Sequence, residues 1–398
     1  MSTQEPSIDP FAPSSPEERY QAFAQLRERA GVHKLPTGQW LALSYAAVEK
    51  GLKSVEHFVG SFGDTGDLPE ERQILAAIPE PRHGRIRRIV NSVFAYHHSS
   101  KVEPFARDLA SGLVDALIAE SCSAGSVCLM QRYARPIPSA VIAHLIGVPS
   151  HDFETFGRWS DEVLERQSQD GAANRPLLEI HPEFDAYLKE QVAMRLGAPN
   201  PPDDLTTRLL HAEVEGEQLT ETAVRTQLMF LIMAGNETTR NLIGNILKRL
   251  AESPELYAAL RSDLSGLDAV IEETLRLDSP VQLLARTCTK PIELDGVQIE
   301  VGDRVLFSVA SADRDAARFS AADEFRLDRE RAREHLGFGA GPHVCPGAFL
   351  ARMETTVALE VFIERVSAFH LAPGEPPSEN PVFWAHGPLT LRVVVEEA

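Results

Sequence analysis

One of the four cysteines, Cys345, lies in a loop whose residue types could support metal chemistry. The loop contains three glycines and two prolines, which favour neither a helix nor a central strand: Phe338-Gly339-Ala340-Gly341-Pro342-His343-Val344-Cys345-Pro346-Gly347. Good helix formers follow from Ala348. We therefore expect Cys345 just before a helix N-terminus, with Pro346 in the first helical turn and the helix end favouring a thiolate. A thiolate on a glycine-rich platform is a soft ligand for iron, as in haem held by cysteine.

The pattern Phe-Gly-x-Gly-x-His-x-Cys-x-Gly resembles the haem-binding loop of the cytochrome P-450 family, the haem-thiolate monooxygenases. The resemblance implies that Cys345 is the axial ligand of the iron of haem b, and that Phe338, Gly339 and Gly347 lie against the haem. Two plainer interpretations are an inert buried cysteine and a thiol nucleophile, and the second would need a base partner. The glycine pattern argues against both.

A second run, Ala234-Gly235-Asn236-Glu237-Thr238-Thr239, follows an apolar stretch and interrupts the pattern of a long helix. A glycine, an acid and two threonines are locally unfavourable in the middle of a helix, so we expect something to compensate for them. The ordinary interpretation is a threonine bonded to the preceding turn beside a solvent-facing acid. The run resembles the oxygen-activation segment of the same family. That resemblance implies that Ala234 and Gly235 make room for dioxygen beside the haem, that Thr238 hydrogen-bonds the bound oxygen, and that Glu237 gates proton supply from water. A hydroxyl beside a carboxylate is a relay that solvent can refill.

The resemblance also supplies partners for the two haem propionates, which need cationic or hydrogen-bonding groups when buried. These are a His-x-x-x-Arg pair, an arginine in an extended stretch and a histidine before the cysteine loop: His83, Arg87, Arg286 and His335. Glu273 and Arg276 share a helix face. In the family such a pair is buried behind the haem loop, with an arginine directly before a phenylalanine as its third member. Here Glu324 precedes Phe325, so we leave three substitutes open: Arg326, Arg329 and His335.

Arginines cluster on one segment of an otherwise acidic chain. The ordinary interpretation is a solvated helix face. The functional one is a docking patch for an acidic ferredoxin or flavodoxin, formed by Arg82, Arg85, Arg88 and Arg352.

The 398 residues carry a net charge of −19, from 39 basic and 58 acidic side chains. This balance argues against nucleic acid and against an anionic membrane surface as partners. The four cysteines lack the close spacing of a zinc or iron–sulfur site, which favours a reduced, cytoplasmic protein. The segment Met1 to Pro6 does not resemble a signal peptide, and the longest apolar run in a helix is too short to span a membrane. We expect a monomer.

Helical patterns dominate to about Leu196, and a proline-rich breaker follows. Thr220 is the predicted N-cap of a helix that extends to about Ala251. Short strands are predicted at 40–43, 297–301, 304–307 and 389–395, and helices at 16–29, 45–52 and 267–277. The fold class is therefore mainly α with small β-sheets. The resemblance implies one domain over residues 1–398, a large triangular cytochrome P-450-like fold with haem between the oxygen-activation helix and the cysteine loop.

Substrate selectivity is poorly encoded in the sequence. By resemblance, the pocket wall is expected from the loop near Phe58 to Gly66 and from five side chains: Phe230, Met233, Val281, Leu284 and Trp384. Their apolar character predicts a hydrophobic small organic substrate, although ordinary core packing would use the same residues. The leading function is therefore a monooxygenase that uses dioxygen and electrons from a ferredoxin system. A peroxide-driven peroxygenase and a non-catalytic haem sensor or carrier are the alternatives.

Overall fold

The computed structural model describes residues 15–60, 68–94, 99–167, 175–214, 216–380 and 383–398. The chain forms two compact units, each described by itself. The first unit comprises Met1–Val59, Glu272–Val344 and Asn380–His386, and the second comprises Gly60–Ile271, Cys345–Glu379 and Gly387–Ala398. The expectation of one domain over residues 1–398 stays a prediction.

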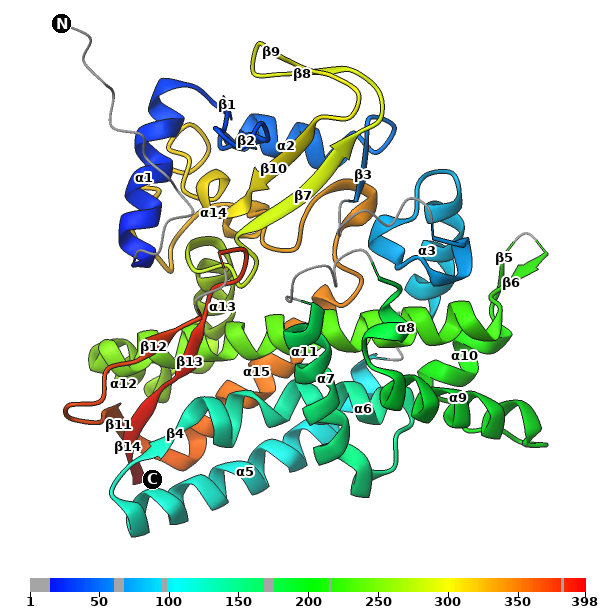
Figure 1. Ribbon diagram of the computed structural model, residues 1–398. Coiled ribbons are helices and arrows are strands. Elements are labelled where there is room, and N and C mark those ends of the chain that lie inside the picture. The colour runs from blue at the N-terminus through cyan, green and yellow to red at the C-terminus, as the bar shows by residue number, and fades with distance from the viewer. Residues whose placement is uncertain (1–14, 61–67, 95–98, 168–174, 215, 381–382) are drawn as a thin grey trace, which may run out of the picture. The chain divides into compact units, whose positions relative to one another are not determined.

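The second unit is a helical assembly around one long helix, α11 (Glu221–Glu252). This helix contacts α6 (Pro136–Ile146), α7 (Phe153–Gln167), α9 (Pro182–Gly197) and α15 (Ala348–Arg365), as Figure 1 shows. A helix that is buried on most of its surface requires partners on several sides. α11 therefore provides the framework against which the other helices of this unit pack.

The predicted N-cap of α11 is confirmed, since the Thr220 side chain accepts a hydrogen bond from the Ala223 N–H. The predicted extent of this helix is confirmed, since α11 ends at Glu252 and is continuous through residues 234–239. Packing from the surrounding helices outweighs the weak local propensity of these residues. Figure 1 shows α11 as one long green helix.

The remaining elements of this unit are further helices and small antiparallel sheets. The other α-helices are α3 (Arg82–Val93), α5 (Glu103–Ala124), α8 (Leu177–Ile180), α10 (Leu205–His211) and α12 (Pro254–Ser262). One sheet has the order β11-β14-β4, from Val366–Leu371, Arg392–Glu397 and Val127–Cys128. The other two are β12-β13 (Ser378–Glu379, Pro388–Thr390) and β5-β6 (Glu213–Val214, Glu217–Gln218). The strand predicted at 389–395 is thus two strands, because the buried Leu391 separates β13 from β14.

The first unit contains a five-stranded sheet of order β1-β2-β10-β7-β3. Its strands are Val32–Lys34, Trp40–Ala42, Arg304–Ser308, Leu283–Cys288 and Phe58–Gly60, and the hairpin β8-β9 (Ile292–Leu294, Val297–Ile299) is separate. The helices are α1 (Pro16–Arg29), α2 (Tyr45–Lys53) and α14 (Val309–Ala312), and α13 (Leu267–Leu277) contributes its residues from Glu272 onward. The helices and strands predicted from the sequence in this unit are confirmed within two residues at each end.

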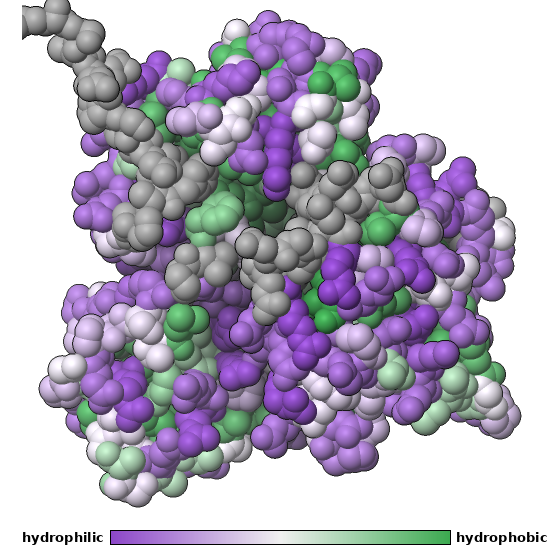
Figure 2. Space-filling view, in the orientation of Figure 1, coloured by the Kyte–Doolittle hydropathy of each residue, from purple (hydrophilic) through white to green (hydrophobic). Residues whose placement is uncertain are grey.

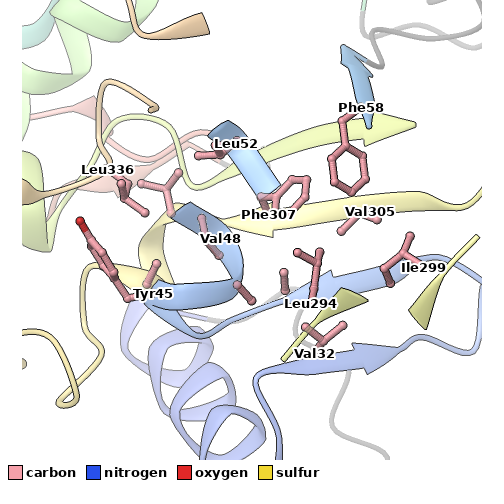
Figure 3. Packing of buried hydrophobic residues seen from close by; sticks show 14 of the residues in the cluster. Val32, Tyr45, Val48, Leu52, Phe58, Leu294, Ile299, Val305, Phe307 and Leu336 are labelled. Atoms are coloured by element: carbon pink, nitrogen blue, oxygen red, sulfur yellow. The ribbon is translucent and has the colours of Figure 1, made fainter. Parts of the chain in front are cut away.

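A hydrophobic cluster holds α2 against this sheet. Val48 and Leu52 of α2 meet Phe307 and Val305 of β10, and Phe58 packs edge-on against Phe307 (Figure 3). Gly51 permits this approach, since a Cβ atom there would lie 2.1 Å from the Phe307 ring. The cluster fixes the sheet, and with it the strand β7 that carries Arg286.

Most side chains on the face shown in Figure 2 are hydrophilic, as the charge of the chain predicts. Across the described residues, no helix is both long enough and apolar enough to cross a bilayer.

Candidate functional site

Cys345 lies between a 3-10 turn at Gly341–His343 and helix α15. The helix begins at Ala348 with Gly347 as its N-cap, so the expectation that Pro346 occupies the first helical turn is wrong. Pro346 and Gly347 instead form a turn that directs the Gly347 N–H toward the sulfur.

The Cys345 thiol is under opposing influences. Burial raises its pKa, whereas the Gly347 N–H and the charges of Arg87 and Arg352 lower it. The net shift is upward, so the expected preference for thiolate does not hold for this sulfur by itself. Coordination to a cation removes a thiol proton outright, and the same N–H and arginines would then stabilise the sulfur charge.

Helix α3 places His83 and Arg87 one turn apart, both buried, with side chains at positions i and i+4. The His83 Nδ1 atom lies 2.9 Å from the Glu80 Oε1 atom. Burial lowers the pKa of the Arg87 guanidinium, and the Cys345 charge opposes this shift. The second unit therefore brings a buried cation and the cysteine into electrostatic contact.

The middle of α11 has an open face. Ala234 is exposed, Phe230, Gly235 and Thr238 are partly exposed, and a Cβ atom added at Gly235 would meet nothing within 4 Å. An accessible stripe on a helix that is otherwise buried leaves room for a ligand. The Thr238 Oγ1 donates to the Ala234 carbonyl oxygen at 2.8 Å. Its hydroxyl is therefore bonded to the preceding turn of the helix, as the ordinary interpretation of this run predicts.

Glu237 is 8% exposed, which excludes the solvent-facing acid of the plainer interpretation. One of its carboxylate oxygens lies 3.5 Å from the Arg240 Nη2 atom. A buried carboxylate of this kind is stabilised by a nearby cation. Sequence reasoning did not identify Arg240, although its i+3 spacing from Glu237 on a helix was a usable signal.

In the first unit, β7 holds Arg286, whose side chain is buried. Burial lowers the pKa of its guanidinium to about 10. Among the described residues, its guanidinium donates to the Ala285 carbonyl oxygen at 2.9 Å, and no carboxylate there is within ion-pair distance. A buried guanidinium in this situation would be stabilised by an anion from outside the chain.

His335 is buried as well. Its Nδ1 atom accepts from the Gly337 N–H at 3.0 Å, and its Nε2 atom lies 3.2 Å from the Glu272 carboxylate. The Phe338 ring is 5.9 Å from the His335 ring, centroid to centroid, and Gly339 has a φ of 74°, which favours glycine. These contacts fix the start of the cysteine loop.

The structure selects Arg329 as the third member of the Glu273–Arg276 pair. The Arg276 guanidinium donates twice to the Glu273 carboxylate, at 2.8 Å each, and the Arg329 Nε atom donates to it at 2.7 Å. Arg326 contributes only its backbone N–H, at 3.0 Å. Arg276 also reaches the backbone carbonyl oxygens of Asp313, Ala322 and Glu324. The pair is therefore a buried network rather than a solvated surface contact.

Arg82 and Arg85, both predicted for docking, are engaged in ion pairs. Arg82 contacts Glu70 at 2.5 Å and also pairs with Glu217, and Arg85 contacts Glu217 at 3.0 Å. Arg88 is exposed on α3, and Arg352 is partly exposed on α15.

The predicted pocket residues divide between the two units. Met233 is buried and Phe230 is partly exposed on α11. In the first unit, Val281 pairs with Ala385, which brings it next to the Trp384 segment, while Leu284 packs against the cluster of Figure 3. Of the predicted loop at 58–66, residues 61–66 lie outside the described residues.

The cytochrome P450 family model matches residues 173–387. The chain is 32% identical to the cytochrome P450 monooxygenase PikC of Streptomyces venezuelae, over 89% of this chain and 86% of that protein. It is 32% identical to a methyl-branched lipid omega-hydroxylase of Mycobacterium bovis, over 85% of this chain and 82% of that protein. Its fold matches the structure of CYP109Q5 from Chondromyces apiculatus with a TM-score of 0.86 and 35% identity, over 98% of each chain.

The chain therefore belongs to the cytochrome P450 family. It is an oxidoreductase of the haem-thiolate monooxygenase class, which takes a haem cofactor, a substrate, dioxygen and a redox partner.

The residues present fit such a cofactor. Haem offers two carboxylates, a flat apolar ring and an iron atom. The buried Arg286 lacks a carboxylate partner among the described residues, the α11 stripe is open at Gly235, and Cys345 is a soft donor beside a buried arginine. Arg286 suits a haem carboxylate, the open stripe of α11 suits the flat apolar ring, and the Cys345 sulfur suits the iron atom.

Proposed function

We propose that Cys345 ligates the iron of haem b and that the enzyme inserts one oxygen atom from dioxygen into a small hydrophobic substrate. When bound, haem held by a thiolate activates dioxygen with two electrons and two protons, so that the second oxygen atom leaves as water. The observation that carries this proposal is the Cys345 sulfur, which receives the Gly347 N–H and lies in the field of Arg87 and Arg352.

In this proposal the side chains around the cofactor have separate tasks. Arg87, Arg286, His83 and His335 offset the propionate charges, while Phe338, Gly339, Gly347, Ala234 and Gly235 line the ring. Thr238 turns its hydroxyl from the Ala234 carbonyl toward oxygen, and Glu237 passes protons to it from water. The relay can be refilled from solvent through Glu237.

A spectrum of the reduced protein with carbon monoxide tests the ligand. The wild-type protein and a Cys122→Ser control, which changes an exposed cysteine, are expected to show the signature of thiolate ligation. Cys345→Ala is expected to lose that signature. Retention of it by Cys345→Ala would overturn the assignment.

We infer electron supply from a ferredoxin and its reductase, docking near Arg82, Arg85, Arg88 and Arg352. A cytoplasmic, monomeric protein stays the prediction of the sequence. The alternative peroxygenase usually has an arginine and a proline in place of the acid and threonine, whereas this chain has Glu237 and Thr238. Turnover with a ferredoxin pair, compared with turnover by hydrogen peroxide alone, separates the two. A haem carrier would show neither.

The substrate class is proposed from the apolar side chains Phe230, Met233, Val281, Leu284 and Trp384. A structure similar to this chain, CYP109E1 from Bacillus megaterium, is in complex with testosterone, with a TM-score of 0.81 and 29% identity. A panel of testosterone and long-chain fatty acids, screened by the shift in haem spin state and then by product formation, tests this class. A panel of charged amino acids and sugars is expected to give no shift.

A further inference from the structure

Helix α7 contacts α11 at the turn that contains Glu237 and Thr238, and it does so through two adjacent residues. Ser160 accepts a hydrogen bond from the Asn236 Nδ2 atom at 2.9 Å. Asp161 accepts from the Arg240 Nη1 atom at 3.3 Å. The two contact points on α11 lie on either side of Glu237 and Thr238, one residue before the acid and two after the threonine.

The first contact is fully buried and its groups are satisfied. Asn236 is 0% exposed and Ser160 is 1% exposed. The Asn236 Oδ1 atom also accepts from the Ser139 Oγ of α6 at 2.9 Å. A buried amide held at both ends permits one orientation, because losing either bond would leave a polar group without water. This contact therefore fixes the positions of α7 and α6 along α11.

The second contact continues as a chain of alternating charges. Glu237 pairs with Arg240 at 3.5 Å, Arg240 pairs with Asp161 at 3.3 Å, and Asp161 pairs with Arg135, which precedes α6. Arg240 is 16% exposed in its side chain and Glu237 10%. Because Arg240 is shared between two carboxylates, a displacement of α7 changes how strongly it holds Glu237.

We propose that α7 positions the proton relay through this two-point contact, and that Arg240 is a positioning residue for Glu237. The inference rests on the proposed function of Glu237. Removing Arg240 is expected to leave the acid mispositioned, so that both protons reach the reduced oxygen without cleavage of the oxygen–oxygen bond and hydrogen peroxide is released. Both outcomes consume one dioxygen, two electrons and two protons. They yield either hydrogen peroxide or, when substrate is oxidised, one hydroxylated product and one water.

The test measures coupling, the fraction of electrons from NADPH that appears in product rather than in hydrogen peroxide. The probe is the panel compound above with the highest product yield, supplied with a ferredoxin and its reductase. Arg240→Gln is expected to raise the ratio of peroxide to product roughly three- to tenfold, while the substrate dissociation constant changes little. Arg240→Lys is expected to retain most of the coupling, because it keeps the charge. Arg158→Gln is the matched control, because Arg158 lies on α7 and, among the described residues, pairs only along its own helix, with Glu162 at 3.1 Å.

A double-variant cycle tests whether the chain acts as a unit. Asp161→Asn is expected to raise the peroxide ratio less than Arg240→Gln does, and the double variant is expected to be no worse than Arg240→Gln. The carbon monoxide spectrum of each variant verifies that the haem protein is intact. If Arg240→Gln stays coupled, or if the two effects add independently, the inference is wrong. If Glu237→Gln is itself fully coupled, the relay in the proposed function is wrong instead.

Discussion

Arg329 completes a buried charge network, and this contact could not be chosen from the sequence. The three candidates, Arg326, Arg329 and His335, lie within ten residues of one another. Their spacing does not show that Arg329 contacts Glu273 with its guanidinium whereas Arg326 contacts it only with its backbone N–H. Arg329→Ala is expected to cost about 3 kcal/mol in the free energy of unfolding, because the Glu273 carboxylate would stay buried with one fewer cation. Denaturant unfolding of the haem-loaded protein measures this.

Arg326→Ala is the control for that experiment. Its guanidinium lies beside the exposed Asp328, at 3.0 Å, while only its backbone N–H contacts Glu273. We expect a change within about 0.5 kcal/mol, as for an ordinary surface substitution. Equal losses for the two variants would show that Arg329 has no special part in the network.

Glu354 is a buried acid on α15, 3% exposed, which the sequence analysis did not single out. Burial raises the pKa of its carboxyl well above its usual range. The folded protein therefore binds a proton that the unfolded chain releases above pH ~4.3, so this group contributes stability at low pH that is lost as pH rises.

We expect Glu354→Gln to be increasingly more stable than the wild type as pH rises above the ordinary glutamate value, by about 1.4 kcal/mol per pH unit until the folded pKa is reached. Unfolding measured between about pH 5 and about pH 8 checks the slope. Glu360→Gln, on the same helix but 2.7 Å from Arg107 and partly exposed, is the control. A slope of the same size in both variants would contradict the role of burial at Glu354.

Two glycines of α11 are expected to respond to alanine in opposite directions. At Gly235 an added Cβ meets nothing within 4 Å, whereas at Gly244 it would lie 2.6 Å from the Met130 sulfur and 3.2 Å from Pro388. Gly235→Ala should gain up to about 1 kcal/mol from helix propensity. Gly244→Ala should lose about 1 kcal/mol net, since overpacking exceeds that gain.

Thermal unfolding of both variants measures these differences. Gly235→Ala is also expected to slow carbon monoxide binding to the reduced protein, because its methyl group enters the open stripe of α11. Gly244→Ala should bind carbon monoxide at the wild-type rate. Faster or unchanged binding in Gly235→Ala would mean that the stripe does not face the oxygen site.

The sequence predicted the elements well where local signals agree. Thr220 before an apolar run marked the start of α11, and Ser253-Pro254 marked its end. Local signals failed where long-range packing decides. Continuity of α11 at Gly235 depends on its neighbouring helices, and strand β4 was missed because two residues pair with β14 near the other end of the chain.

The same reason limits what could be predicted of the site. Cys345, Glu237 and Thr238 could be predicted as site residues because each lies in a motif with fixed spacing. The contact between Arg240 and Asp161 could not be predicted, because the two residues are 79 positions apart and meet only when α7 packs on α11.

Because the chain carries a net charge of −19, an acidic redox partner would be attracted only where exposed cations locally outweigh the acidic surface. Arg88 is exposed on α3, the helix that also holds Arg87 beside Cys345. Arg88→Glu is therefore expected to lower the association rate with an acidic ferredoxin several-fold at low salt, and the difference should shrink as salt rises. Stopped-flow reduction at increasing ionic strength measures both.

Arg158→Glu is the control for net charge. It changes the net charge by the same amount as Arg88→Glu, but at an exposed position on α7. If docking is local to α3, only Arg88→Glu slows association. If both variants slow it equally, the partner responds to net charge alone, and the predicted patch of Arg82, Arg85, Arg88 and Arg352 is not a docking site. Because steering by a patch depends on direction whereas net charge does not, the comparison of the two rates decides between them.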